Sequence, residues 1–424
     1  MKEDFLHYLW KFQKFQVREL HTVAREKIEI ITPGQHNHLS GPDFFDARLR
    51  IGGQLWAGNV EIHIRSSHWY AHGHEKDRAY DNVVLHVVWE DDAPVFRGDN
   101  TRIPALELKT VTPDNLQQNY RKLLKNSCSF INCEKSMARV DPFLRDAYLE
   151  RLFFERMERK SVTVLQDLKR SGNDWEAVFF RQLMRNFGLK INGESFRSVA
   201  DSIDFKVVRK VQHEVLLMEA LLFGQAGLLG EDETPDTYMK VLRKEYLYLQ
   251  RKFGLSSAGV VPPYFHRLRP ANFPTVRLSQ LANLYCQRKT LFTLVMETDR
   301  VADFYSVLES SASPYWDDHY TFGKISGKHR KVVSRNFMDL LIVNTVLPVK
   351  FCYMRYLGRE ADERLLELAR SLNPEKNSIT AGYTGIGIKP GDVADSQALL
   401  QLYHAYCSEN RCVECTIGHQ LLKT

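Results

Sequence analysis

The stretch from Gly34 to Glu90 constrains the fold most strongly, because its apolar residues follow the patterns that β-strands require. Phe44 to Ile51 and Gln54 to Arg65 flank Gly52-Gly53, a pair of residues typical of a tight β-hairpin. Val83 to Trp89 is a continuous apolar run with the length of a buried strand. These patterns predict a small β-sheet in the first quarter of the chain.

The second arm of this hairpin places chemically useful side chains together. Val60 and Ile62 point to one face of the strand, so Glu61 and His63 share the opposite face. Seven of the 15 histidines of the chain lie between positions 36 and 86. Because imidazole and carboxylate groups carry protons and bind metals, this stretch is the candidate functional region.

The neighbouring segments complete an α+β pattern. Residues 4–27 carry apolar side chains at helical spacing, and Ile28 to Ile31 form a β-branched run that stops at Pro33-Gly34. Residues 67–81 are polar and rich in histidine, which predicts a connector or a short helix. Residues 103–111 predict one more strand. We therefore expect a helix, a strand, a hairpin pair, a short helix or loop and further strands, which together form a small mixed sheet.

Two short motifs in this order of elements resemble the PD-(D/E)XK nuclease-like core. Pro42-Asp43 is similar to its first motif and Glu61-Ile62-His63 to its second, and 18 positions separate the two acids. The resemblance implies that Asp43 and Glu61 hold Mg²⁺ or Mn²⁺, and that metal-activated water hydrolyses a phosphodiester of DNA or RNA. His63 replaces the usual lysine, so we expect it to act as a general base or as a nitrogen ligand for Mn²⁺ or Zn²⁺.

Purely structural roles explain the same three residues equally well. Asp43 can cap a turn, Glu61 can be a solvated strand residue, and His63 can lie on a half-exposed strand face. The two interpretations differ in geometry, because only the functional one requires the side chains to converge on one point.

Further polar residues nearby are candidates for substrate binding. Asn37 and His38 lie in the predicted turn before the first acidic motif. His72 and His74 belong to the histidine-rich connector, where the glycine between them argues against a regular helix and favours a polar loop. His86 lies inside an apolar strand, so we expect a hydrogen-bonded core histidine rather than a ligand.

From about Pro142 the sequence changes to helical periodicity with abundant leucine, methionine and aromatic residues. We therefore predict a nuclease-like α/β domain at residues 1–125 and a mostly α-helical domain at residues 126–424. The expected helices cover residues 143–169, 175–187, 206–223, 237–253, 275–286 and 334–346.

The whole chain also resembles an uncharacterised bacterial family of unknown function. The likeness lies in the histidine-rich block and in two phrases, Glu219 to Gly227 (EALLFGQAG) and Arg269 to Pro274 (RPANFP). This second resemblance implies no particular activity.

Two other motifs occur in the helical part. Arg269 and Arg277 flank two prolines before a predicted helix, where an anion such as a substrate phosphate would meet free N–H groups. The alternative is a helix entry set by proline with no ligand. Gly382 to Gly391 predicts a glycine-rich loop, followed by a helix that Asp392 or Asp395 would cap.

The cysteines cluster at the C-terminal end. The chain has seven cysteines, an odd number, which predicts reduced thiols or a metal site rather than a disulfide framework. Cys407, Cys412 and Cys415 supply three ligands for Zn²⁺ or an iron–sulfur cluster, unless they are simply thiols packed around a terminal helix. The fourth ligand would come from His404, His419 or a distant residue such as Cys352.

Composition and charge narrow the class of protein. The chain of 424 residues is 44% hydrophobic and 26% charged, which is typical of a globular protein. No apolar run approaches the roughly 18 residues needed to span a bilayer, and the first residues lack the apolar core of a signal sequence. We therefore expect a cytoplasmic protein without membrane contact.

The net charge of +6 is unevenly distributed. Residues 1–110 contain 14 Lys and Arg against 16 Asp and Glu, which leaves 44 against 36 for residues 111–424. A basic C-terminal part suits a polyanion such as nucleic acid, and surface charge kept for solubility is the alternative.

Three functions are compatible with these observations. The first is a metal-dependent nuclease whose helical body holds the nucleic acid. The second is a non-catalytic nucleic-acid-binding or assembly protein that retains the nuclease-like fold. The third is a zinc-dependent hydrolase of another substrate, built around the histidine cluster.

Overall fold

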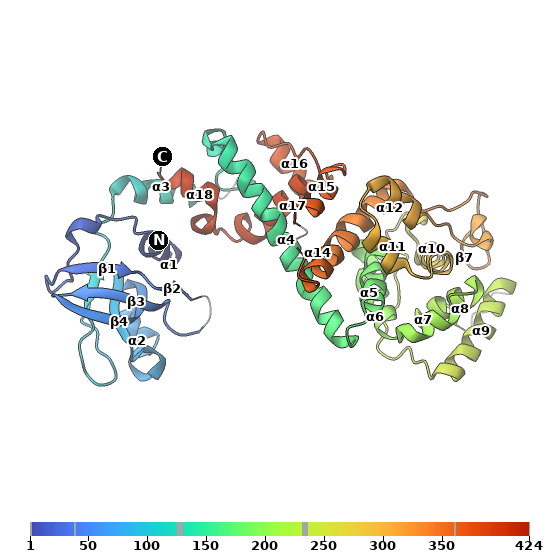
Figure 1. The fold of residues 1–424 in the computed structure, drawn as a ribbon, viewed down its shortest axis with the longest axis horizontal. Helices are drawn as coiled ribbons and strands as arrows, with labels where there is room; N and C mark the ends of the chain where they lie inside the picture. The colour runs from blue at the N-terminus through green and yellow to red at the C-terminus, as the bar shows by residue number, and fades with distance from the viewer. Residues whose placement is uncertain (1, 38–39, 125–129, 231–235, 360–361, 424) are drawn as a thin grey trace. The chain divides into compact units, whose positions relative to one another are not determined.

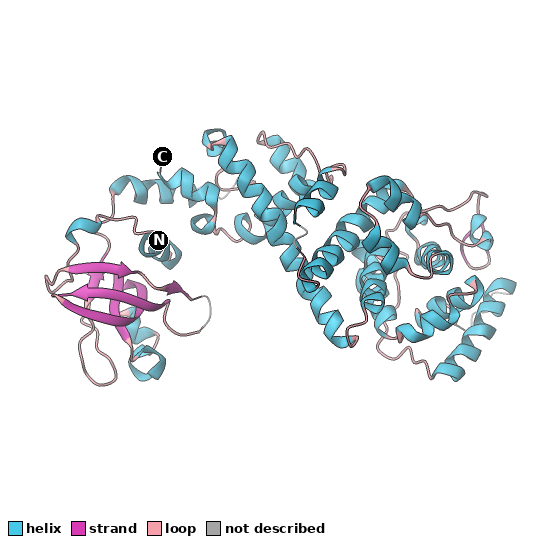
Figure 2. Cartoon of the chain, viewed as in Figure 1, coloured by secondary structure: helices cyan, strands magenta, loops and turns pink. Residues whose placement is uncertain are grey.

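The computed structural model describes residues 2–37, 40–124, 130–230, 236–359 and 362–423 (Figure 1). The chain divides into two compact units. The N-terminal unit comprises residues 1–149, 381–388 and 402–424, and the helical unit comprises residues 150–380 and 389–401. The large sheet lies within the N-terminal unit, and the helical unit is built mostly of helices and loops (Figure 2).

The sheet of the N-terminal unit is mixed, with the strand order β1-β3-β4-β5-β6 and β2 paired to β3. Pairing is antiparallel from β1 to β4 and parallel from β4 to β6. This confirms the predicted small mixed sheet and the hairpin around Gly52-Gly53. Both glycines have positive φ angles. The strands are β1 (Ile28–Thr32), β2 (Gln35–His36), β3 (Phe44–Ile51), β4 (Gln54–Arg65), β5 (Val83–Glu90) and β6 (Ala105–Glu107).

The connection from β4 to β5 crosses the sheet because these two strands are parallel. It contains α2 (His68–Ala71) and two 3-10 turns, His74–Lys76 and Arg78–Tyr80. Gly73 adopts a left-handed conformation with φ of 73°, which ends the helical geometry after one turn. The histidine-rich segment is therefore a compact connector, as the glycine predicted.

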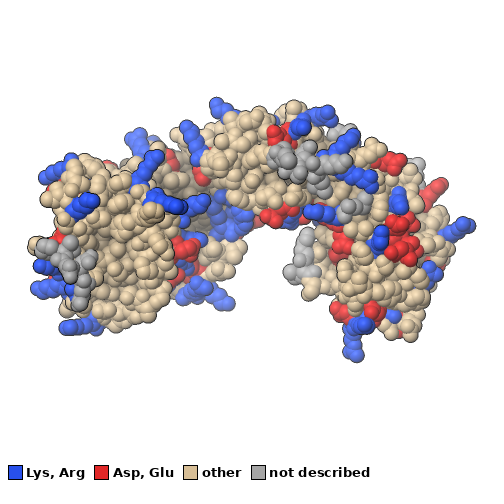
Figure 3. Space-filling view, turned by 180° about the vertical axis from the view of Figure 1, so that it is seen from behind, with Lys and Arg blue, Asp and Glu red and all other residues tan. Residues whose placement is uncertain are grey.

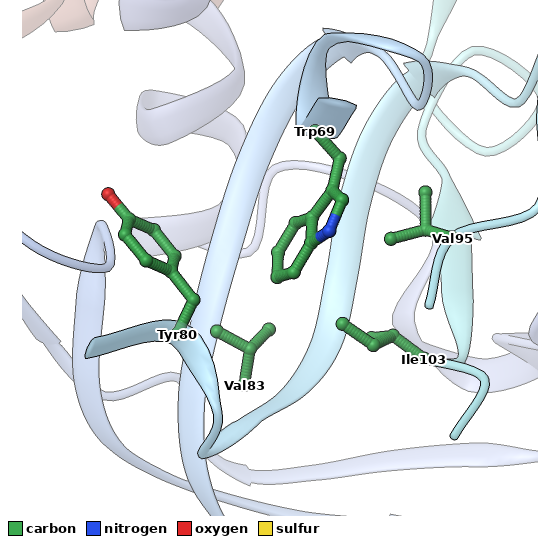
Figure 4. Close-up of a cluster of buried hydrophobic side chains, with 5 residues drawn as sticks. All are labelled: Trp69, Tyr80, Val83, Val95 and Ile103. Atoms are coloured by element: carbon green, nitrogen blue, oxygen red, sulfur yellow. The ribbon is translucent and has the colours of Figure 1, made fainter. Parts of the chain in front are cut away.

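A small apolar cluster anchors this connector on the sheet (Figure 4). The indole of Trp69 is fully buried and stands over Val83 and Ile103, between Tyr80 and Val95. Its Nε1 donates a hydrogen bond to the carbonyl oxygen of Phe96 at 3.1 Å, so the polar atom of the ring is also satisfied. The connector is thus fixed by burial rather than by regular secondary structure.

The first helix, α1 (Glu3–Lys11), is shorter than the helical pattern over residues 4–27 predicted. Gln13 has a φ of 49°, which breaks the helix, and only a 3-10 turn follows at Val17–Glu19. Phe5 and Leu9 are nevertheless buried as the spacing required, and α1 packs against β4. The strand expected over residues 103–111 is also shorter. Of these residues, only β6 (Ala105–Glu107) pairs with β5.

The C-terminal end of the chain returns to the N-terminal unit. Helix α18 (Thr416–Lys423) packs beside α3 (Asp114–Leu124), and Asn119 Nδ2 donates to the Leu422 carbonyl oxygen at 3.3 Å (Figure 1). This division differs from the single boundary near residue 125 that the change in periodicity predicted. Sequence periodicity identifies helices but does not show in which of the two units a helix is packed.

Helices occur where the leucine-rich pattern predicted them, except that the single helix expected over residues 206–223 is two helices, Phe205–Val211 and Val215–Gln225. The segment Gly382 to Gly391, expected to be a loop, is helical up to Gly385 in α16, and Asp392 accepts a hydrogen bond from the Asp395 N–H as predicted. The remaining helices are α4 (Pro142–Arg170), α5 (Trp175–Phe187), α6 (Leu189–Asp201), α7 (Phe205–Val211), α8 (Val215–Gln225), α9 (Thr237–Phe253), α10 (Pro274–Gln287), α11 (Leu291–Glu297), α12 (Val301–Leu308), α13 (Arg335–Leu341), α14 (Leu347–Tyr356), α15 (Asp362–Arg370), α16 (Ser378–Gly385) and α17 (Val393–Leu402), with a minor strand pair β7 (His319–Thr321) and β8 (Lys324–Ile325).

One continuous helical stretch, Arg335–Tyr356, is long and apolar enough by composition to cross a membrane. It joins α13 and α14 through a π-helical turn at Ile342–Val346, and most of its surface is buried inside the protein. Polar residues such as Asp339, Asn344 and Lys350 interrupt its apolar sequence, and its apolar residues form protein core.

The packing of β4 against β5 predicts that Gly58→Ala destabilises the sheet. An added Cβ would lie 2.5 Å from both the Asn82 carbonyl oxygen and Val84 Cγ1. Because a backbone atom cannot rotate away, we expect a loss of about 1–3 kcal/mol and faster hydrogen–deuterium exchange in the β4 and β5 peptides. The control Gly385→Ala, with no atom within 4 Å of the new Cβ, should leave that exchange unchanged. Equal protection in both variants would contradict the close approach.

Candidate functional site

Two hydrogen bonds hold Asp43 beside the part of β4 that carries Glu61. The Asp43 N–H donates to Oε2 of Glu61 at 3.1 Å, and the Ile62 N–H donates to Oδ2 of Asp43 at 3.0 Å. Asp43 immediately precedes β3 and Glu61 lies on β4, so the antiparallel pairing of these strands brings the two carboxylates together. The two acids that the sequence singled out therefore do meet at one place.

Three histidines gather beside Glu61. His63 follows on the same face of β4, and His72 and His74 come from the crossover connector. Their ligand atoms all lie within 4.8 Å of one another. Oε1 of Glu61 lies 3.3 Å from Nε2 of His74 and 3.6 Å from Nε2 of His63. The three nitrogens are close enough to hold one ion, and Oε1 of Glu61 lies beside two of them.

The three histidines differ in how far they are exposed to solvent. His63 is only 2% exposed, His74 is half-buried and His72 is exposed. A metal ion held here would be fixed by protein on one side and open to solvent on the other. An open side is what a catalytic metal site requires, because water or substrate must occupy a coordination position.

His86 lies behind His63 in the core. Its Nε2 is 2.8 Å from Nδ1 of His63, and the side chain is fully buried. Nε2 of His63 in turn lies 3.1 Å from Nδ1 of His72. If His63 carries its proton on Nδ1 and donates it to His86, the Nε2 lone pair is left for a metal. The prediction that His86 is a hydrogen-bonded core histidine is consistent with this geometry.

Burial keeps the two inner histidines neutral. It is the main cause that lowers the pKa of His63 to about 2, and repulsion from the surrounding histidines adds to it. Burial likewise lowers the pKa of His86 to about 3. Neutral imidazole is the form that binds metals, whereas so weak a base removes a proton from water poorly. The low pKa therefore argues against the expected role of His63 as a general base.

The acidic side of the site is also shifted by burial. Burial raises the pKa of Glu61, opposed by its contact with His74, and the nearby charge of Asp43 raises it further. A buried carboxylate of this kind gains from a neighbouring cation. Tyr80 stacks on His74 with ring centroids 3.8 Å apart, and burial followed by the charge of Glu61 raises its pKa to about 12.

His7 joins the site from α1. Its Nε2 lies 3.3 Å from Oδ2 of Asp43. Burial lowers the pKa of His7, but the adjacent Asp43 carboxylate and the charges of Glu3 and Glu61 outweigh it, so the pKa is raised overall. A protonated His7 next to Asp43 could neutralise an anionic group that approaches the carboxylates. No sequence pattern pointed to His7, because it lies on α1, far in sequence from Asp43 and Glu61.

The remaining candidates have other positions. Nδ2 of Asn37 donates to the carbonyl oxygens of Ser40 and Pro42, both at 3.1 Å, so Asn37 shapes the turn that precedes Asp43. His38 lies outside the described residues. Arg269 is exposed in the helical unit, just before the 3-10 turn Pro270–Asn272 that leads into α10.

The neighbour of Arg269 in the motif, Arg277, is buried within the helical unit. Its guanidinium donates to Oδ1 of Asn272 at 2.6 Å and lies 3.6 Å from the ring centroid of Phe337. These contacts use Arg277 in protein packing. Pro274 occupies the first turn of α10, so the motif has the geometry of a helix entry set by proline.

Comparison with known proteins gives a family for the chain. The sequence profile of a family described as "Protein of unknown function (DUF2851)" matches residues 3–378. The chain belongs to this family. No curated protein and no solved structure matches the chain. Membership in DUF2851 agrees with the expected relationship to an uncharacterised family, and it carries no activity with it.

The low pKa values of the inner histidines predict that the metal-free N-terminal unit loses stability in acid. The unfolded chain binds a proton at each histidine below about pH 6.5, whereas folded His86 does so only near 3. Stability therefore falls as pH decreases through this window, by up to about 1.4 kcal/mol per pH unit for each such group. Hydrogen–deuterium exchange of β5 with a chelator present, measured from pH 7 to 4, checks this.

The variant His86→Phe separates this effect from general acid sensitivity. It removes one proton-binding group, so its loss of stability per pH unit should be shallower than in the wild type. The matched control His21→Gln changes an exposed histidine of the same unit and should keep the wild-type slope. Identical slopes in all three proteins would show that His86 does not resist protonation.

Proposed function

We propose that this DUF2851 chain is a metal-dependent hydrolase that cleaves phosphodiester bonds in nucleic acid. The reaction would take place at Asp43, Glu61 and the histidines His63, His72 and His74. The observation that carries the proposal is that three imidazoles from β4 and from the connector lie within 4.8 Å of one another beside the carboxylate of Glu61, which accepts a hydrogen bond from the Asp43 N–H.

Convergence of this kind needs a physical reason. Buried polar groups cost free energy unless they are paired, and three imidazoles beside two carboxylates gain most from a shared cation. The ion would polarise a phosphoryl oxygen and lower the pKa of a bound water, which supplies a nucleophile at neutral pH. Glu61 and the histidines would hold it, while Asp43 lies close enough to orient the water or complete the ligand set.

The donor set also bears on the identity of the metal. Mg²⁺ prefers oxygen ligands in octahedral geometry, whereas imidazole nitrogen suits Mn²⁺, Fe²⁺ and Zn²⁺. With three histidines and one glutamate within reach, the site favours a transition metal such as Mn²⁺ or Zn²⁺ over Mg²⁺. The replacement of the usual lysine by His63 then changes the ligand set rather than removing the chemistry.

The resemblance to the PD-(D/E)XK nuclease-like core supports the choice of reaction. In this chain the acid of each motif, Asp43 and Glu61, takes part in the same pair of hydrogen bonds. The resemblance was based on the order helix, strand, hairpin, short helix or loop, and strand, and the observed elements follow this order. The fold analogy favours phosphodiester hydrolysis over other reactions, and the site itself must be tested.

The charge of the helical unit supports a nucleic-acid substrate. Helix α9 carries five basic residues against a single acidic one, Glu245. Tyr248 is 54% exposed among them, and aromatic rings next to basic groups suit the bases and phosphates of a single strand. Elsewhere basic and acidic side chains are interspersed on the face shown in Figure 3. The basic residues of α9 are Lys240, Arg243, Lys244, Arg251 and Lys252.

The proposal predicts metal-dependent nuclease activity that the two acids control. Full-length protein supplied with Mn²⁺ or Zn²⁺ should cleave DNA or RNA oligonucleotides. Asp43→Asn and Glu61→Gln should each lower the rate by about 10²-fold or more, because each removes a charge that stabilises the reacting centre. Metal binding, followed by isothermal titration calorimetry, should weaken in Glu61→Gln and in His74→Asn. Gel assays of labelled oligonucleotides measure the cleavage.

The control His266→Gln changes an exposed histidine of the helical unit and should keep both metal affinity and turnover. Nucleic-acid binding without turnover in the wild type, with any of these metals, would indicate the non-catalytic binding protein instead. Stoichiometric zinc with turnover only of a different ester would indicate the third function. Turnover that survives both acid substitutions would overturn the proposed site.

The role of α9 generates a separate prediction. Reversing Lys240, Lys244 and Arg251 to glutamate should weaken nucleic-acid binding and reduce the slope of log K against log salt by about 1 for each phosphate that the variant no longer binds. Metal affinity at the histidines should not change. Fluorescence anisotropy over a salt series measures the slope. Reversal of three other exposed lysines of the same unit should have a smaller effect, and equal losses would contradict a specific role for α9. These control positions are Lys289, Lys324 and Lys328.

A further inference from the structure

Four free cysteines belong to the N-terminal unit. Three of them, Cys407, Cys412 and Cys415, lie near the C-terminal end, as the sequence indicated. The fourth, Cys133, comes from the segment that precedes α4. We infer that these four thiols ligate a metal centre, zinc or an iron–sulfur cluster, with Cys133 as the fourth ligand.

Neighbouring side chains show how the two segments meet. Asn132, next to Cys133, donates from Nδ2 to Sγ of Cys412 at 3.5 Å and to Oδ1 of Asn410 at 2.8 Å. The Tyr383 hydroxyl lies 3.4 Å from Sγ of Cys407. Cys133 is therefore brought to the C-terminal cysteines by direct contacts of its own segment.

An aromatic contact holds the same arrangement from the other side. Phe130 lies three residues before Cys133, and its ring centroid is 5.1 Å from that of Tyr383 and 5.3 Å from that of Tyr403. Stacked and edge-on aromatic pairs of this kind add to the stability of a buried interface. The convergence of these segments thus rests on several independent contacts.

Hydrogen-bond donors already point at the sulfurs. The Tyr383 hydroxyl favours the thiolate of Cys407, and the Asn132 amide favours that of Cys412. The N–H groups of Gly418 and Ile417 act in the same way on Cys415. Donors to thiolate sulfur are the outer-shell contacts that stabilise zinc and iron–sulfur centres and tune their properties.

The other candidates for the fourth ligand are engaged or positioned elsewhere. His419 contacts the Val413 carbonyl oxygen through Nε2, and its ring lies 4.9 Å from that of Tyr8. Cys352 is buried in α14 of the helical unit. His404 is exposed to solvent on the last helical turn before Cys407.

The spacing of the sulfurs bears on the kind of centre. In a tetrahedral zinc site with Zn–S bonds of about 2.3 Å, the sulfurs stand about 3.8 Å apart. Within the described residues, the histidine trio is the group of ligands found inside 4.8 Å, and the four sulfurs do not form a group that tight. A cluster in which each cysteine binds a different iron atom accepts the wider spacing, whereas zinc would require the side chains to draw together.

The inference does not depend on the proposed hydrolase, and metal content tests it directly. Full-length protein purified without oxygen should contain zinc, or iron with acid-labile sulfide, in a fixed ratio to protein. Elemental analysis and visible absorption distinguish the two, and either result supports a four-thiolate centre. Cys133→Ser should lose that metal to background, while the control Cys286→Ser, which changes a free cysteine of the helical unit, should retain it.

The double variant His72→Ala/His74→Ala distinguishes metal bound by the histidine trio from metal bound by the thiols. It should leave the thiol-bound metal unchanged. If Cys133→Ser aggregates, alkylation of the wild type decides: the four thiols should be protected together and become reactive together when a chelator removes the metal. Protein without metal and with four reactive thiols would overturn the inference. Metal retained in Cys133→Ser, or a disulfide at Cys133, would do the same.

Discussion

The parallel pairing of β4 and β5 is the constraint on which the candidate site depends. Parallel neighbours cannot be joined by a tight turn, so the chain crosses one face of the sheet and brings His72 and His74 over the strand that carries Glu61 and His63. The buried indole of Trp69 packs this crossover against the sheet. The histidines are thus positioned by sheet topology and packing, because the connector has little regular structure of its own.

Around this frame, the site combines neutral nitrogen donors with negatively charged oxygen donors. Burial keeps His63 and His86 unprotonated, and two hydrogen bonds hold Asp43 beside the part of β4 that carries Glu61. Repulsion between the acids and the cost of burying Glu61 both decrease when a cation binds. A metal would give one physical explanation for features that would each be costly alone. Nε2 of His7 lies 3.3 Å from Oδ2 of Asp43, whose charge helps to raise the pKa of His7.

The C-terminal end of the chain belongs to the same unit as this site, although most of the helical unit lies between them in sequence. Helix α18 packs beside α3, and the segment before α4 contacts the C-terminal cysteines through Asn132. A metal bound by Cys133, Cys407, Cys412 and Cys415 would link the segment before α4 to the C-terminal segment. These segments are otherwise joined by a few helical contacts. Long loops closed by such a bond are expensive to form in the unfolded chain, so a metal there would stabilise the unit as a whole.

The sequence by itself determined the hairpin, the faces of β4, the helical character of the second part and the two acids, because these depend on short-range periodicity and turn chemistry. Tertiary structure decided the rest. Which strands run parallel, where the early helix ends, and that His7 reaches Asp43 and Cys133 reaches Cys412 all depend on contacts between residues distant in sequence. The role of His63 is the clearest case: its residue type suggested a base that titrates near neutral pH, and only its burial beside other histidines lowers its pKa to about 2.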